Sequence, residues 1–227
     1  MTEIRTPIES VVFDFSGTLF RLEPTSDWDT PDLSPDELDT VVSWLTEPAG
    51  PPVPLNDEDH RAWELRDLDP SMHRSVYTEI LERFDASSGV DVLPMLDVLV
   101  DPLRWTPYPD TGVVLEKLCT AGIPVAVLSN ISFDIRPAFA LRGWDRWIES
   151  FVLSYELGAG KPDPTAFTTA IERIGGRPET TLMIGDSPGT DGAAASVGCA
   201  VSLVESLPTG LRSDGLANAL AKHHIEV

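Results

Sequence analysis

The sequence has little cysteine and little lysine. Its two cysteines, Cys119 and Cys199, stand in no spacing that binds a metal or forms a redox pair. We therefore expect two reduced, buried thiols in a cytoplasmic protein. Only three lysines occur among the 227 residues, at positions 117, 161 and 222, so a lysine in a functional position has few alternatives.

Basic charge and long apolar runs are also scarce. Lys and Arg number 16 against 37 Asp and Glu, a formal net charge of −21, which argues against a nucleic-acid partner and against an anionic membrane surface. The uncharged stretch 192–204 is shorter than the roughly 20 residues that span a bilayer. The N-terminal residues MTEIRTPIES lack the apolar core of a secretion signal.

Two outer segments of the chain alternate apolar runs with helical patterns. The runs predict strands near 8–13, 123–128, 151–153, 181–185 and 200–204. The helical patterns lie near 110–121, 132–142, 164–174 and 189–197, with Asp110 and Ser132 as candidate N-caps. Strands with apolar residues in succession are covered on both faces. The alternation therefore predicts an α/β fold, a doubly wound, Rossmann-like parallel sheet.

The middle segment, residues 21–106, has a different character and is called the insert below. It holds 20 acidic and 6 basic residues. A capping box at Ser34-Pro35-Asp36-Glu37 begins a first helix, and further helices are predicted near 57–68 with Asn56 as its cap, 71–84 and 92–100. No strand signal intervenes. We expect a core of residues 1–20 and 107–227 and an inserted α-helical bundle of residues 21–106.

Polar residues follow four of the predicted strands, where an open parallel sheet binds its ligands. Clustered carboxylates suit Mg²⁺, a carboxylate can act as a nucleophile, and a lysine beside it keeps it ionised. Hydroxyl and backbone N–H groups hold phosphoryl oxygens. The residues in question are Asp14, Ser16, Thr18, Ser129, Asn130, Lys161, Asp186 and Asp191.

The four motifs VVFDFSGTLF, VLSN, GKPDP and IGDSPGTD resemble, in order and spacing, those of the haloacid dehalogenase superfamily with a helical cap after the first motif. The resemblance implies a phosphatase-like hydrolase that uses Mg²⁺ and acts on a small phosphorylated metabolite. It assigns Asp14 as nucleophile and metal ligand, the Ser16 backbone carbonyl and Asp186 as further metal ligands, and Asp191 as an outer-shell residue. It assigns Lys161 as partner of Asp14 and the phosphate, and Thr18 and Ser129 as phosphate-binding residues. Asn130, which follows the second predicted strand, is expected to bind phosphoryl oxygens as well.

One position departs from the family pattern. Its phosphatases carry a second Asp two residues after the nucleophile, which protonates the leaving group and then activates water; here that residue is Ser16. Losing general acid–base help typically costs 10²–10⁴-fold in rate. We expect the loss to matter least for leaving groups that need no proton, as in aryl and acyl phosphates.

The favoured function is hydrolysis of a small phosphate monoester or acyl phosphate through an aspartyl phosphate on Asp14. A catalytically weak phosphate-binding or interaction protein on the same fold is the alternative, favoured by Ser16. A 2-haloacid dehalogenase comes third, because Asp186 and Asp191 argue against that metal-free chemistry. The phosphonate-cleaving relatives use a lysine of the cap, and residues 21–106 contain none. The sequence leaves the oligomeric state and the substrate open.

Overall fold

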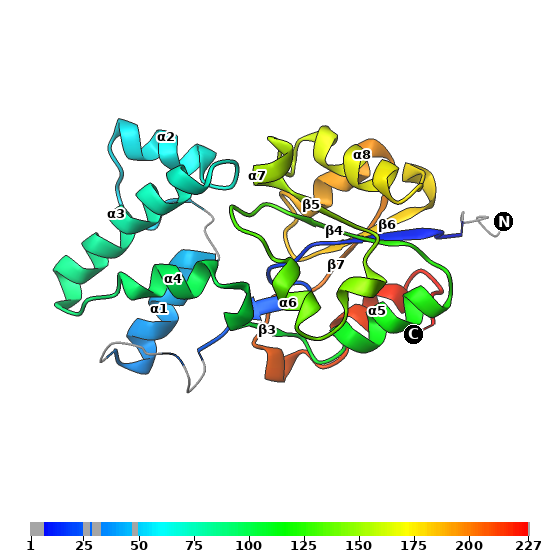
Figure 1. Cartoon of the computed structure of the whole chain (residues 1–227), viewed down its shortest axis with the longest axis horizontal. Coiled ribbons are helices and arrows are strands. Elements are labelled where there is room, and N and C mark those ends of the chain that lie inside the picture. Colours follow the sequence, from blue (N-terminus) through cyan, green and yellow to red (C-terminus); the bar gives the residue numbers. More distant parts are fainter. Residues whose placement is uncertain (1–6, 25–27, 29–32, 47–49, 227) are drawn as a thin grey trace.

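In the computed structural model, which describes residues 7–24, 28, 33–46 and 50–226, a parallel sheet lies at the centre of one half of the molecule (Figure 1). Five strands pair in the order β5-β4-β1-β6-β7. Their bounds are β1 Ser10–Phe13, β4 Val125–Ser129, β5 Ser150–Leu153, β6 Thr181–Gly185 and β7 Ala200–Leu203. All four pairings are parallel, so the predicted α/β class and its strands are confirmed.

Helices cover both faces of this sheet. Successive residues of a strand face opposite layers, and in β1 Val12 packs into one apolar cluster while Val11 and Phe13 pack into the other. One layer holds α8 Pro164–Arg173 and the 3₁₀ helix η4 Asp191–Val197, and the other holds α5 Thr111–Thr120 and α9 Gly215–Ala221. The short elements are α6 Arg136–Ala140, η2 Asp145–Trp147, α7 Ser154–Leu157, η3 Pro178–Thr180 and η5 Thr209–Leu211.

Several expected helix boundaries were wrong. The helix expected over 132–142 begins only at Arg136, and Ser132 caps nothing, because Pro137 has no N–H and is accommodated only in a first turn. The segment 189–197 forms the 3₁₀ helix η4 from Asp191 onward. Asp110 makes no side-chain bond to its own helix α5; it caps α9, a helix that the sequence did not predict.

The described part of the insert contributes four α-helices that lie beside the sheet half of the molecule (Figure 1). They are α1 Pro35–Thr46, α2 Asp57–Leu65, α3 Pro70–Ser88 and α4 Pro94–Val100. Two predicted caps are confirmed: the Ser34 N–H and hydroxyl donate to the Glu37 carboxylate at 2.8 and 2.6 Å, and Asn56 accepts from two backbone amides of α2.

The expectation that the insert holds no strand was wrong. β2 Phe20–Leu22 pairs antiparallel with β3 Trp105–Pro107, directly after the 3₁₀ helix η1 Pro102–Arg104. Phe20 and Trp105 are both buried, and burial of these two aromatic side chains explains why such short runs pair. The two strands close the base of the insert where its chain leaves and rejoins the rest of the protein.

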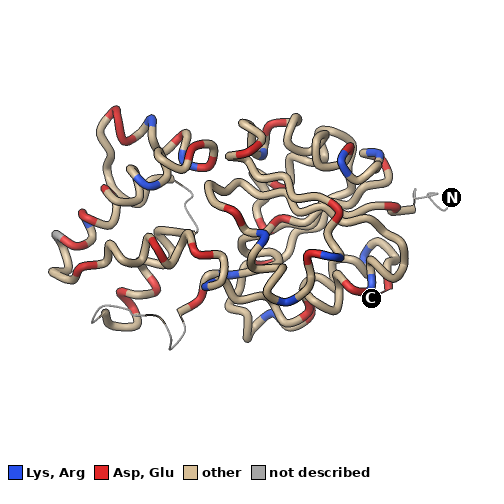
Figure 2. The backbone as a smooth tube through the Cα atoms, in the orientation of Figure 1, with Lys and Arg blue, Asp and Glu red and all other residues tan. Residues whose placement is uncertain are grey.

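Along the backbone of the insert, Asp and Glu outnumber Lys and Arg (Figure 2). Cys199 is buried, but Cys119 is exposed, so the expectation of two buried thiols was wrong for Cys119. It follows the fully buried Leu118 on α5 and therefore lies on the outward side of that helix. Within the described residues, no helix has both the length and the apolar character needed to cross a membrane.

Candidate active site

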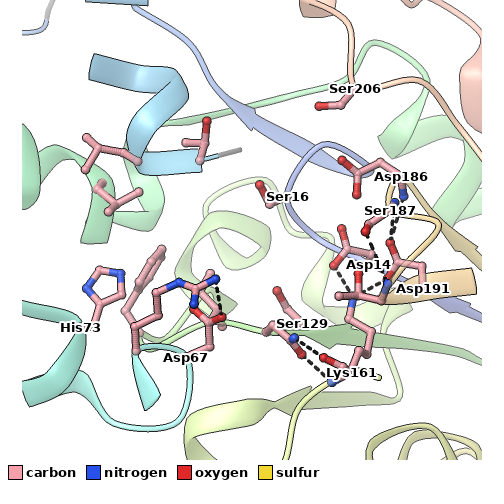
Figure 3. Close-up of a pocket in the computed structure, with 18 of the residues that line it drawn as sticks. Asp14, Ser16, Asp67, His73, Ser129, Lys161, Asp186, Ser187, Asp191 and Ser206 are labelled. Carbon is pink, nitrogen blue, oxygen red and sulfur yellow. Dashed lines mark hydrogen bonds and ion pairs between the residues drawn. The ribbon is translucent and has the colours of Figure 1, made fainter. Parts of the chain in front are cut away.

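A cavity of about 500 Å³ lies at the carboxyl edge of the sheet, between that edge and the insert (Figure 3). Most of the residues predicted from the motifs line it. They are Asp14, Ser16, Ser129, Asn130, Lys161, Asp186 and Asp191. The tertiary structure thus brings together residues from four separate loops, as the strand-end argument predicts.

Lys161 forms two buried ion pairs at the floor of the cavity. Its Nζ lies 2.6 Å from Oδ1 of Asp14 and 2.6 Å from Oδ1 of Asp191. The second oxygen of Asp191 accepts the backbone N–H groups of Asp186 and Ser187, each at 3.0 Å. Asp191 is therefore fully engaged in positioning Lys161 and the loop after β6, whereas one oxygen of Asp14 has no hydrogen bond of this kind.

Two glycines allow these loops to approach each other. Gly17 has a φ of +73°, and a Cβ there would lie 2.3 Å from Oδ2 of Asp186. At Gly185 a Cβ would lie 2.2 Å from the Asp191 carboxylate. Glycine at position 17 therefore lets the first motif approach Asp186 of the fourth, and glycine at position 185 makes room for Asp191 within the fourth motif.

The carboxylates of Asp14, Asp186 and Asp191 form an acidic cluster, with one oxygen of each lying within 4.8 Å of the others. Burial, and next the charge of the other two carboxylates, raise the pKa of Asp14 to about 7, although Lys161 opposes the shift. Burial and then Asp191 raise the pKa of Asp186 to about 6. The neighbouring carboxylates raise the pKa of the Lys161 ammonium against the effect of burial. The carboxylates of Asp14 and Asp186, beside that of Asp191, provide the oxygen donors that a hard divalent cation such as Mg²⁺ prefers.

The amide of Asn130 is engaged with the backbone rather than free in the cavity. Its Nδ2 donates to the Lys161 carbonyl at 2.6 Å, and its Oδ1 accepts the Lys161 N–H at 2.7 Å. A Cβ at Gly160 would lie 2.7 Å from that Oδ1, so the glycine makes room for the contact. Ser129, the last residue of β4, is buried and faces the cavity.

Thr18, predicted as a phosphate-binding residue, is fully buried and is not among the residues that line the cavity. Its hydroxyl has no hydrogen-bond partner. Its carbonyl accepts from Arg212, which also donates to Gly17 O at 2.6 Å and to Glu205 O at 2.9 Å. Arg212 is thus a buried support of the first motif, and no sequence motif pointed to it.

The insert supplies the opposite wall of the cavity, including Arg66, Asp67, His73 and Tyr77. The approach of these side chains to Asp14 depends on how the insert packs.

One hydrogen bond fixes this wall: the Ser154 hydroxyl donates to the Asp67 carbonyl, which joins the insert to the core half. Two titratable side chains of the wall have shifted pKa values. Burial, and next the charges of Arg66 and Arg74, lower the pKa of His73 to about 4, and burial raises the pKa of Tyr77 to about 12. Both side chains are therefore uncharged at neutral pH.

Residues 8–198 match a family model described as haloacid dehalogenase-like hydrolase. Phosphoserine phosphatase of Thermus thermophilus is 33% identical over 89 residues, which cover 39% of this chain and 36% of that protein. Glyceraldehyde 3-phosphate phosphatase of Methanopyrus kandleri is 32% identical over 185 residues, covering 79% and 76% of the two chains. The solved L-2-haloacid dehalogenase of Xanthobacter autotrophicus aligns with a TM-score of 0.65 at 23% identity, covering 93% and 83%.

Proposed function

The chain belongs to the haloacid dehalogenase-like hydrolases, and on that basis we propose that it is a Mg²⁺-dependent phosphatase of a small phosphate monoester or acyl phosphate. The observation that supports the proposal most directly is the buried pair of Lys161 and Asp14, a member of the acidic cluster, at the floor of the cavity. Phosphatases of the same family among its relatives support the same reaction class.

In the proposed reaction, a carboxylate oxygen of Asp14 attacks phosphorus, and the bond from phosphorus to the leaving oxygen breaks. Lys161 favours the ionised form of Asp14, because its ammonium lies 2.6 Å from one of the two carboxylate oxygens. Water then attacks phosphorus, the bond to Asp14 breaks, and inorganic phosphate is released. The Ser129 hydroxyl lies at the cavity wall, where it can donate to a phosphoryl oxygen.

Mg²⁺, when bound, neutralises charge between nucleophile and phosphoryl group. The proposed ligands are the carboxylates of Asp14 and Asp186 and the backbone carbonyl of Ser16. Asp191 is proposed as an outer-shell residue, because both of its oxygens already accept hydrogen bonds.

The insert, residues 21–106, is proposed to act as a cap domain that covers the cavity and selects the substrate. Its side chains form one wall of that cavity, and closing such a wall excludes water from the reaction. Arg66 is the side chain best placed to meet a second anionic group on a small metabolite, since its buried Nε has no hydrogen-bond partner.

Ser16 supports one alternative function, that of a catalytically weak phosphate-binding protein with the same site.

The experiment that tests the proposal measures phosphate release from 4-nitrophenyl phosphate and acetyl phosphate, with Mg²⁺ or EDTA, for the wild type and Asp14→Asn. We expect release that requires Mg²⁺ and disappears in Asp14→Asn. Binding of Mg²⁺ and phosphate without release from either compound favours the alternative function, and chloride release from a 2-haloacid without metal favours a dehalogenase.

A further inference from the structure

The position two residues after Asp14 has no acid, but the cavity has another carboxylic side chain that belongs neither to the acidic cluster nor to the ion pairs of Lys161. Asp67 follows the end of α2 and lines the cavity from the insert side, whereas Asp14 lies on the core side (Figure 3). Among the described lining residues, it is the single carboxylic side chain that the insert contributes.

From this arrangement we propose that Asp67 is the general acid and base of the reaction, in place of the acid that Ser16 lacks. The inference rests on the proposed phosphatase function. It assigns to the insert a chemical step and not merely a role in covering the site.

The stereochemistry of phosphoryl transfer supports a carboxyl on that side. The attacking and leaving oxygens stand roughly in line across phosphorus, so a leaving group displaced by Asp14 departs away from the floor of the cavity. The water that later displaces Asp14 must enter from the same side. One carboxyl on the insert wall is therefore placed for both proton transfers.

The position of Asp67 is fixed by bonds that leave its carboxylate free to react. Its backbone carbonyl accepts from the Ser154 hydroxyl, and its Oδ2 lies 3.6 Å from a guanidinium nitrogen of Arg66, too far for a hydrogen bond. The carboxylate is thus oriented by the chain and by one cation, without a short bond that would have to break.

The charged and titratable groups around Asp67 favour it over other candidates. Burial raises the pKa of Asp67, while the charges of Arg66 and Lys161 oppose that shift. His73 has its pKa lowered to about 4 and Tyr77 has its pKa raised to about 12. Neither is a suitable acid at neutral pH, because the imidazole holds no extra proton and the phenol releases its own too weakly.

The protons balance over the two steps. In the first step Asp67 gives its proton to the leaving oxygen as the bond from that oxygen to phosphorus breaks, which releases an alcohol and leaves phosphate on Asp14. In the second step the Asp67 carboxylate takes a proton from water as the water oxygen bonds to phosphorus and the bond to Asp14 breaks. The sum is one phosphate ester and one water converted to one alcohol and one phosphate.

The test compares wild type, Asp67→Asn and the control Glu64→Gln, an exposed carboxyl of α2, on phenyl phosphate and acetyl phosphate. For Asp67→Asn we expect kcat/KM to fall 10²–10⁴-fold on phenyl phosphate and less than about threefold on acetyl phosphate, whose leaving group needs no proton. We also expect kcat to fall on both substrates, with phosphate trapped on Asp14, because water attack loses its base.

A second variant separates this role from a structural one. We expect the double variant Ser16→Asp/Asp67→Asn to have at least ten times the activity of Asp67→Asn on phenyl phosphate. An equal loss of kcat/KM on both substrates, or an unchanged value on phenyl phosphate, overturns the role of Asp67 while the phosphatase function stands. Absence of phosphate release by the wild type overturns both.

Discussion

The side-chain amide of Asn130 spans the backbone of Lys161, donating to its carbonyl at 2.6 Å and accepting its N–H at 2.7 Å. The loop after β4 thereby holds the loop that carries the lysine. Since the Lys161 ammonium lies 2.6 Å from both Asp14 and Asp191, Asn130 controls the placement of the charge pair at the floor of the cavity. It acts through Lys161 as a positioning residue.

Asn130→Asp tests this relationship with almost no change of shape. The aspartate still accepts the Lys161 N–H but cannot donate to its carbonyl, and it adds a negative charge beside an acidic cluster. We expect kcat to fall by about 10–100-fold with the fold intact, as measured by 4-nitrophenyl phosphate turnover and circular dichroism. Ser132→Ala, a buried serine of the same loop, is the control, and equal activity of Asn130→Asp and wild type contradicts the role.

Mg²⁺ is expected to stabilise the folded protein. At a concentration about 100 times its dissociation constant, a ligand adds about 2.7 kcal/mol, which corresponds to roughly 5–10 °C in Tm for a chain of this size. Asp186→Asn should abolish most of the shift, whereas Asp145→Asn, an exposed residue, should keep it. A shift that survives in Asp186→Asn places the cation elsewhere.

The same site predicts the pH dependence of metal binding. The pKa of Asp14 is raised to about 7 and that of Asp186 to about 6, and both carboxylates must lose their protons to bind a cation. Affinity for Mg²⁺ should therefore be full only above about pH 8 and weaken progressively toward pH 5, as measured by titration calorimetry. Equal affinity at pH 8 and pH 5.5 contradicts this set of ligands.

His73 predicts a pH-dependent part of the stability. Its pKa is about 4 in the folded chain and about 6.5 when unfolded, so as pH falls the unfolded chain binds the proton first. The free energy of unfolding therefore has its full value above about pH 6.5. It decreases between pH 6.5 and 4, by at most about 3 kcal/mol, because the proton binds more tightly to His73 in the unfolded chain.

Urea unfolding of wild type and His73→Asn at several pH values measures this effect. The free energy of unfolding of wild type relative to His73→Asn should fall as the pH falls from 6.5 to 4. His60→Asn, which alters an exposed histidine of α2, controls for the substitution itself. Parallel curves for wild type and His73→Asn would refute the prediction.

Asp110 is expected to stabilise the C-terminal helix. Its Oδ2 accepts the backbone N–H groups of Leu216 at 2.8 Å and Ala217 at 3.1 Å, in the first turn of α9. Removing a cap of this kind typically costs about 0.5–2 kcal/mol. Asp110→Ala should lower the free energy of unfolding by that amount and speed amide exchange at Leu216 and Ala217, while Asp110→Asn, which retains an acceptor, should lose less.

The sequence alone determined the α/β class and most of the residues that meet at the cavity floor. Asp14 and Asp186 directly follow their strands, Lys161 follows β5 after one short helix, and parallel strands all end at the same edge. The sequence therefore sufficed to place Asp14, Lys161 and Asp186 together. Local capping rules likewise placed the starts of α1 and α2, because a cap and its helix are adjacent in the chain.

Only the tertiary structure decided the contacts between distant segments. Asp110 precedes one helix but caps another more than 100 residues away, the Asn130 amide binds the backbone of Lys161, and Arg212 supports the first motif from near the C-terminus. The approach of Asp67 to the cavity depends on how the insert packs against the core. Side-chain packing and long-range hydrogen bonds fix these relationships, and neither leaves a local pattern in the sequence.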